Sequence, residues 1–387
     1  MNRRALLRFG SLLLSQAMLP PLPALDRYAD GLPDPPAARR TVIAFARAIS
    51  YGVAIHKEPN LSAKILGTLM PDSVLPIYAE LETDSGNWHN KLWYEVQGGY
   101  VFSAMVQPVP WQLNQPRTDA GPDGFWAEVT VPYTDARYGP SFSAPRTKYR
   151  YYGTTVYKVI KVVKSSDAPG ASSTPAASST PAGTATPSAT ATPFVPGPSS
   201  DLLWYQIEDE SFPGLYFVPG MHLRAILPEE FTLLSPDVSP ADKKLVVSLR
   251  EQRVRAYEKD KEVFTSRTAT GAVFKDLGDK GDFQTPTGTY HIYRKTPSQH
   301  MYGGAAGDSD YFDLPGIPWV SYFITTGIAF HGTYWHNDYG VQRSHGCVNV
   351  LPAAAKWIWR WSLPLNNPLV RYSMSDTIDG GTKVIVQ

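Results

Sequence analysis

Short apolar runs alternate with turn residues along the first part of the chain. Between residues 41 and 110 these runs are separated by pairs such as Pro71-Asp72 and Gly98-Gly99. Strands of this length and spacing predict a small antiparallel barrel. The pattern returns over residues 120–226, where Leu203-Trp204-Tyr205 echoes Leu92-Trp93-Tyr94. We therefore expect two related small β barrels.

Residues 165–200 interrupt the second barrel. They are almost entirely Ser, Thr, Ala, Pro and Gly. A segment of this composition buries too little apolar surface to offset its ordering entropy, so we predict that it is disordered. A flexible insertion in place of a hairpin loop is favoured over an O-glycosylated or wall-spanning tract.

The last domain, residues 241–387, has the pattern of hairpin-linked strands. Strands are predicted over residues 244–249, 254–258, 263–270 and 382–386. Pro352 begins a predicted helix, in which Trp357 and Trp361 lie four residues apart on one face. We expect these tryptophans to pack rather than to bind sugar. The predicted fold class is therefore mostly β with a short helix.

The N-terminus has the pattern of an export signal. Arg3, Arg4 and Arg8 precede or begin a mostly apolar stretch that Pro20 ends. We interpret residues 1–25 as a signal peptide or an uncleaved membrane anchor, and residues 26–40 as a linker. Both the general secretory and the twin-arginine routes stay open. The expected location is the cell envelope, outside the cytoplasm.

Charge and cysteine content narrow the classes of function. The formal net charge of the 387 residues is +1, which gives no indication of a nucleic-acid partner. Cys347 is the single cysteine, so an exported chain cannot use it for an internal disulfide. A reactive thiol is then the favoured interpretation, and a small buried apolar side chain is the alternative.

Two histidines lie where either could act as a base for this thiol. Cys347 lies within Ser344-His345-Gly346-Cys347-Val348-Asn349, and His331 ends an apolar run. An imidazole can take the proton of a thiol that attacks a carbonyl group. His345 is two positions from Cys347, on the same side of an extended segment, whereas His331 would emerge from a buried strand. Gly346 leaves backbone amides bare beside a developing oxyanion.

We expect residues 336–338 to form a solvent-exposed loop. A zinc site built from His331, His336 and His345 matches no common spacing of zinc ligands. The stretch from Gly303 to Asp310 is small and polar. It is interpreted either as a flap over the site or as a long loop.

His331 and the later segment together resemble the signature of the L,D-transpeptidase catalytic domain, often called YkuD-like. That signature is a histidine, a variable spacer, and then Ser/Thr-His/Lys-Gly-Cys-x-Asn/Arg. Thr270-Gly271, the segment Thr285–Tyr290 and the segment Gly381–Val384 also match. The implied fold of residues 241–387 is a β-sandwich.

The resemblance implies the roles of the site residues. Cys347 would be the nucleophile and His331 its general base and acid. The oxyanion hole and pocket would be formed by Gly332, Ser344, His345, Gly346, Asn349 and Tyr322. The thiol would attack an L,D-peptide bond of a peptidoglycan stem peptide, release D-Ala and form a thioester that an amine of a neighbouring stem resolves. No metal or cofactor is implied.

The strand Trp93-x-x-Val96, a glycine turn and Gly99-Tyr100-Val101 resemble a bacterial SH3 domain. Such domains would bind wall peptides or space the enzyme from the membrane. The expected partners are donor and acceptor stem peptides, and the protein is expected to be a monomer. Two alternatives remain: a thiol hydrolase or carboxypeptidase acting on the same stems, and a non-catalytic wall-binding protein.

Overall fold

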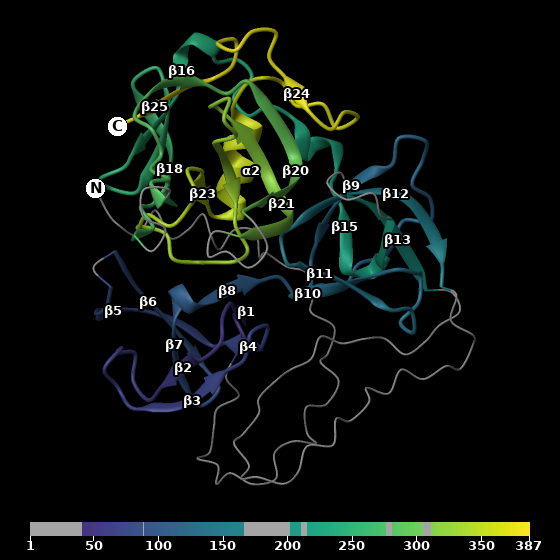
Figure 1. Ribbon diagram of the computed structural model, residues 1–387, viewed down its shortest axis with the longest axis vertical. Coiled ribbons are helices and arrows are strands. Elements are labelled where there is room, and N and C mark those ends of the chain that lie inside the picture. Colours follow the sequence, from purple (N-terminus) through teal and green to yellow (C-terminus); the bar gives the residue numbers. More distant parts are fainter. Residues whose placement is uncertain (1–40, 88, 166–201, 210–214, 276–280, 305–310) are drawn as a thin grey trace. The chain divides into compact units, whose positions relative to one another are not determined.

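The computed structural model describes residues 41–87, 89–165, 202–209, 215–275, 281–304 and 311–387. The predicted export segment and linker, and nearly all of the insertion, therefore lie outside the described residues. Regular structure is mostly β, as predicted (Figure 1). No helix in the described part of the chain is both long and apolar enough to cross a membrane.

The first β region pairs its strands in two groups. The orders are β4-β1-β8 and β3-β2-β7-β6-β5. The strands are β1 (Ala44–Ala48), β2 (Val53–His56), β3 (Ile65–Leu69), β4 (Val74–Ile77), β5 (Ala79–Asn87), β6 (Asn90–Val96), β7 (Gly99–Phe102) and β8 (Val106–Val109). The Trp93 side chain is fully buried beside Phe102, with ring centroids 5.3 Å apart.

The second β region has the strand order β11-β10-β14-β13-β12-β9-β15. The strands are β9 (Phe125–Val129), β10 (Tyr133–Arg137), β11 (Arg146–Tyr152), β12 (Val156–Lys164), β13 (Leu203–Glu208), β14 (Leu215–Pro219) and β15 (Leu223–Ala225). Both regions contain strand, strand, 3-10 turn and strand in succession, with Ser103–Met105 and Gly220–His222 as the turns. Trp93 and Trp204, the tryptophans of the sequence echo, are both fully buried. The relation to SH3 domains stays a prediction.

The C-terminal region forms a curled sheet in the order β19-β25-β16-β17-β18-β23-β22-β21-β20-β24. The strands are β16 (Lys243–Ser248), β17 (Arg253–Glu258), β18 (Lys261–Ala269), β19 (Gly288–His291), β20 (Arg294–Gly303), β21 (Phe312–Tyr322), β22 (Ala329–Gly332), β23 (Val348–Val350), β24 (Ser373–Met374) and β25 (Lys383–Val386). Short 3-10 turns, Pro228–Phe231 and Pro240–Asp242, precede β16. The predicted opening hairpins and final strand are confirmed.

The predicted helix is confirmed as α2 (Pro352–Trp361), which lies against β21 and β22 (Figure 1). Its Trp359 and Trp361 side chains are fully buried, and Trp357 stacks on Trp361 at 5.4 Å. These tryptophans pack, as expected. At the C-terminal end of the helix, Lys295 Nζ donates to the carbonyls of Trp359 (2.7 Å) and Ser362 (2.6 Å).

The β20–β21 hairpin was not predicted from the sequence. Pro297, Pro315 and Pro318 lie within it, and proline normally argues against a strand interior because it has no N–H to donate. Most of the small polar stretch interpreted as a flap or long loop, residues 305–310, lies outside the described residues.

Candidate active site

The parallel pair of β22 and β23 brings the histidine and the cysteine into one neighbourhood. Phe330 pairs with Val348, and His331 with Asn349. Cys347 comes just before β23 and packs in a cluster that includes Ala329. Because Ala329 and His331 are two residues apart on one strand, their side chains share a face. The thiol and the His331 imidazole therefore lie on the same side of the sheet.

The His331 side chain is held as a neutral imidazole. Its exposed fraction is 2%, and Nδ1 lies 3.0 Å from the carbonyl oxygen of Gly332. A carbonyl only accepts hydrogen bonds, so Nδ1 carries the proton and Nε2 carries the lone pair. Burial lowers the pKa of His331 to about 4, although the hydrogen bond to Gly332 acts in the opposite direction.

The Cys347 thiol is half-buried and protonated in this arrangement. Its Sγ donates to the carbonyl oxygen of Gly327 at 3.7 Å. Burial raises the pKa of Cys347 to about 11, against an opposing effect from a hydrogen bond to the Ala329 backbone. Within the described residues no hydrogen bond joins Sγ to the His331 ring. Thiol and imidazole are thus a neutral pair near pH 7.

Ser344 and Gly346 shape the turn that carries the thiol. The Ser344 hydroxyl donates to the Cys347 carbonyl oxygen at 2.5 Å and accepts from the Gly346 N–H at 3.2 Å. Gly346 has a φ of +110°, and a Cβ there would lie 3.2 Å from the Ile328 side chain. The turn therefore depends on a hydroxyl at 344 and on glycine at 346.

His345 is exposed and lies among phenylalanine rings. It stacks on Phe274 at 4.8 Å, meets the edge of Phe283 at 4.6 Å and contacts Phe312 at 5.4 Å. Aromatic contacts at these distances orient the ring. The sequence did not indicate this phenylalanine cluster, because its members come from separate parts of the chain.

Tyr322 belongs to the apolar cluster against which Cys347 packs. It is buried in the same apolar cluster as Ala329 and Cys347. The Arg294 guanidinium covers its ring at 4.0 Å from the centroid, a cation–π distance. Of the predicted pocket residues, Ser344, Gly346 and Tyr322 are thus in the turn or the apolar cluster of Cys347. Gly332 and Asn349 lie on the paired strands β22 and β23.

The prediction that residues 336–338 form an exposed loop is wrong. His336 is only 3% exposed, and its Nε2 accepts a hydrogen bond from Asn349 Nδ2 at 3.0 Å. Burial lowers the pKa of His336 to about 3, and electrostatic interactions with Arg343 and His331 act in the same direction. The loop is drawn inward because Tyr339, six residues after Thr333, donates from its hydroxyl to the Val350 carbonyl at 3.1 Å.

The same loop contacts the two N-terminal β regions. Arg47 Nη2 donates to the Tyr334 carbonyl oxygen at 2.5 Å, and the Tyr152 ring stacks on Tyr334 at 5.2 Å. Farther along the loop, Asp338 pairs with His89 at 2.9 Å. Residues far apart in sequence thus support the segment that follows His331.

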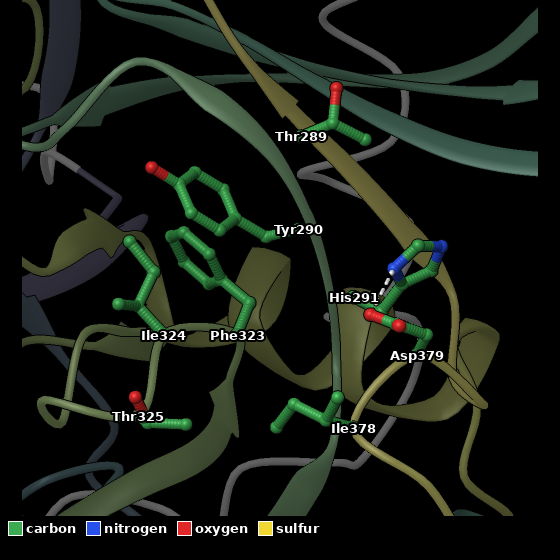
Figure 2. Close-up of a pocket in the computed structure, with 8 residues that line it drawn as sticks. All are labelled: Thr289, Tyr290, His291, Phe323, Ile324, Thr325, Ile378 and Asp379. Carbon is green, nitrogen blue, oxygen red and sulfur yellow. Dashed lines mark ion pairs between the residues drawn. The ribbon is translucent and has the colours of Figure 1, made fainter.

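A shallow cavity of about 230 Å³ lies elsewhere on the C-terminal region (Figure 2). It is lined by Thr289, Tyr290, His291, Phe323, Ile324, Thr325, Ile378 and Asp379. At one side His291 Nδ1 lies 3.4 Å from Asp379 Oδ1. Neither Cys347 nor His331 lines this cavity, so we do not take it as the catalytic site. Within the described residues no group of three or more His, Cys, Asp or Glu side chains could hold a metal ion.

Residues 242–386 match the family model described as the L,D-transpeptidase catalytic domain, YkuD. The match confirms, for these residues, the resemblance carried by the histidine and cysteine motifs. The C-terminal region is thus an enzyme domain of the L,D-transpeptidase type, and these enzymes are acyltransferases. No curated protein matches the chain.

Solved L,D-transpeptidase structures are similar to the chain at low identity. One from Enterococcus faecium is 19% identical over 38% of this chain and 50% of its own, with a TM-score of 0.28. One from Mycobacterium smegmatis is 15% identical over 48% and 90%, with a TM-score of 0.29. One from Xylanimonas cellulosilytica is 24% identical over 38% and 60%, with a TM-score of 0.26. The chain spans half of the length of the first of these.

Proposed function

We propose that this chain, with an L,D-transpeptidase catalytic domain at residues 242–386, is an exported cysteine transpeptidase that cross-links peptidoglycan stem peptides. The observation that carries the proposal is that Cys347 and His331 lie on the same side of the paired strands β22 and β23. Both residues fall within the matched segment, and both belong to the motif of that family.

The first half-reaction forms a thioester. The Nε2 of His331 accepts the Cys347 proton as Sγ attacks the carbonyl carbon of an L,D-peptide bond in the donor stem. The bond from that carbon to the D-Ala nitrogen then breaks, and the His331 imidazolium returns the proton to the leaving amine. The Gly332 carbonyl, which accepts from Nδ1, keeps the proton-accepting nitrogen on the other side of the ring.

The second half-reaction transfers the acyl group. An amine from a neighbouring stem attacks the thioester carbon, and His331 takes the proton that this amine loses. The bond to Sγ breaks, an amide forms, and the thiol is restored. The neutral resting pair suits this cycle, because an imidazole with a lone pair can serve as base in each half-reaction.

Export and wall association are further parts of the proposal. The apolar N-terminal stretch preceded by arginines supports export to the cell envelope. The repeat of strand, strand, turn and strand supports a pair of SH3-like domains that hold or space the enzyme at the wall. In this proposal the protein acts as a monomer.

The test uses the purified full chain and disaccharide-tetrapeptides. Mass spectrometry should detect cross-linked dimers, free D-Ala and an acyl adduct on Cys347. Cys347→Ala should abolish all three products, and His331→Gln should lower their rate by at least about 100-fold. Normal turnover by Cys347→Ala would contradict the proposed mechanism.

The product masses also separate the alternatives. Tripeptides without dimers would indicate a hydrolase or carboxypeptidase that passes the thioester to water. A wild-type protein that pulls down with cell wall but never acylates Cys347, even with a carbapenem, would indicate a wall-binding protein.

A further inference from the structure

Thr285 connects two backbone segments, one at Gly271 and one at Gly346 in the turn that carries Cys347. Its side chain is buried, with an exposed fraction of 2%. The hydroxyl oxygen accepts from the Gly271 N–H at 2.9 Å, and the hydroxyl donates to the Gly346 carbonyl oxygen at 2.8 Å. Glycine at 271 permits this approach, because a Cβ there would lie 1.9 Å from the Phe283 carbonyl oxygen.

The Gly346 carbonyl belongs to the peptide unit that also contains the Cys347 N–H. In a trans peptide these two groups point in opposite directions. Since Thr285 holds the carbonyl on its own side, the Cys347 N–H must point to the other side. No hydrogen bond from this N–H to a described residue is present. In the same turn, Ser344 already engages the Gly346 N–H and the Cys347 carbonyl.

We propose that Thr285 is a positioning residue that keeps the Cys347 N–H directed at the oxyanion of acyl transfer. The inference rests on the proposed function, in which attack by Sγ places a negative charge on the former carbonyl oxygen. A fixed backbone N–H stabilises such a charge without reorganising. Glycine at 346 makes the peptide unit easy to rotate once the Thr285 hydroxyl is gone.

The geometry also explains why the hydroxyl and not the bulk of Thr285 matters. Valine has nearly the same shape but neither accepts nor donates a hydrogen bond. Thr285→Val would leave the buried Gly346 carbonyl and the Gly271 N–H without their partner, so the peptide unit would turn toward other donors. Serine keeps the hydroxyl, so Thr285→Ser should keep the orientation of the peptide unit between Gly346 and Cys347.

The experiment compares full-length wild type, Thr285→Val, Thr285→Ser and the matched control Thr287→Val, whose side chain is exposed. Two reactions of Cys347 are followed by mass spectrometry. Acylation by a tetrapeptide donor or a carbapenem develops an oxyanion. Alkylation by iodoacetamide displaces iodide at a saturated carbon and develops none, so it reports only thiol access and ionisation.

For Thr285→Val we expect kcat and carbapenem acylation to fall by about 10- to 100-fold, while KM and the alkylation rate change by less than about 3-fold. Thr285→Ser and Thr287→Val should acylate nearly as fast as wild type. Three results would overturn the assignment. Thr285→Val could lose acylation and alkylation rate equally, it could lose no acylation rate, or Thr285→Ser could acylate as slowly as Thr285→Val. Wild type that reacts with carbapenem but yields no peptide dimers would contradict the cross-linking function alone.

Discussion

Burial, rather than a charged neighbour, sets the ionisation of Cys347. The pKa of Cys347 is raised to about 11 and that of His331 is lowered to about 4. Both shifts favour the uncharged forms, because each group leaves water without gaining an ionic partner. An imidazolium–thiolate pair is therefore not the resting state. In the proposed mechanism, the proton moves from Cys347 to His331 when the substrate arrives.

This state predicts the pH dependence of Cys347 alkylation. The thiol pKa is raised, so the thiolate fraction should increase about tenfold per pH unit throughout the range from pH 6 to pH 9. Iodoacetamide rates measured by mass spectrometry over that range check the slope, and the single cysteine makes the labelled site unambiguous. A rate that is already constant between pH 6 and 7 would indicate a preformed ion pair instead.

At the scale of elements, β22 and α2 have little room between them. Gly332 ends β22, and a Cβ at this position would lie 2.9 Å from Pro352 Cα at the start of α2. That contact is with backbone, so it cannot be relieved by rotating a side chain. The close approach fixes the distance between the strand that contains His331 and the helix.

Gly332→Ala should lower the free energy of unfolding by about 1–3 kcal/mol, because β22 and α2 must separate. Gly67→Ala in β3 is the control, since no atom lies within 4 Å of the Cβ it would add. Urea unfolding of both variants measures the difference. Equal changes in the free energy of unfolding of the two variants would show that β22 and α2 can separate at this contact without loss of stability.

The C-terminal end of α2 is stabilised by buried amines. Lys295 donates to the carbonyls of Trp359 and Ser362, and Lys243 donates to the Trp361 carbonyl at 3.2 Å. Positive or polar donors at this end satisfy carbonyls that the helix leaves without partners. Burial lowers the pKa of Lys295 well below its ordinary value, and Lys243 adds to this effect.

Lys295→Met should therefore destabilise the protein by about 2 kcal/mol, because two buried carbonyls lose their donor. Lys383→Met, at an exposed position in β25, should change stability by less than about 0.5 kcal/mol. Thermal unfolding with a matched urea series compares the two. If the stability of Lys295→Met equals that of the wild type, removing the cost of burying the amine offsets the lost hydrogen bonds.

For the whole molecule, several buried histidines make stability depend on pH. Burial lowers the pKa values of His222, His331 and His336 from 6.5 to about 4, 4 and 3. Between these values and 6.5 the unfolded chain binds more protons than the folded one, so stability decreases as pH falls. For His300, hydrogen bonds to Asp209 and Asp313 outweigh burial and raise its pKa, which acts in the opposite sense.

The predicted outcome is a lower midpoint of thermal unfolding at pH 5.0 than at pH 7.5. Each neutral buried histidine contributes about 2 kcal/mol across this interval, and the shift should reach at least about 5 °C. Differential scanning calorimetry at both pH values checks it. A midpoint that rises toward pH 5.0 would mean that the ion pairs of His300 dominate.

Local periodicity was enough to predict the opening strands, the helix and the strand that contains His331. Features that depend on long-range partners were not predictable. His336 is buried with a hydrogen bond from Asn349, and the Trp359 carbonyl near the helix end has its donor in Lys295 of a distant strand. Thr285 was part of a matching motif, but only the fold reveals that its hydroxyl reaches Gly346.

The burial of Cys347 has a consequence for the survival of the thiol. Peroxides and disulfides react with the thiolate form, and a thiol with a raised pKa offers little of it at neutral pH. A protein proposed to work outside the cytoplasm has no reducing pool to restore an oxidised cysteine. Cys347 is then protected from irreversible damage while idle. In the proposed mechanism it becomes nucleophilic only when a substrate carbonyl is close enough for His331 to remove its proton.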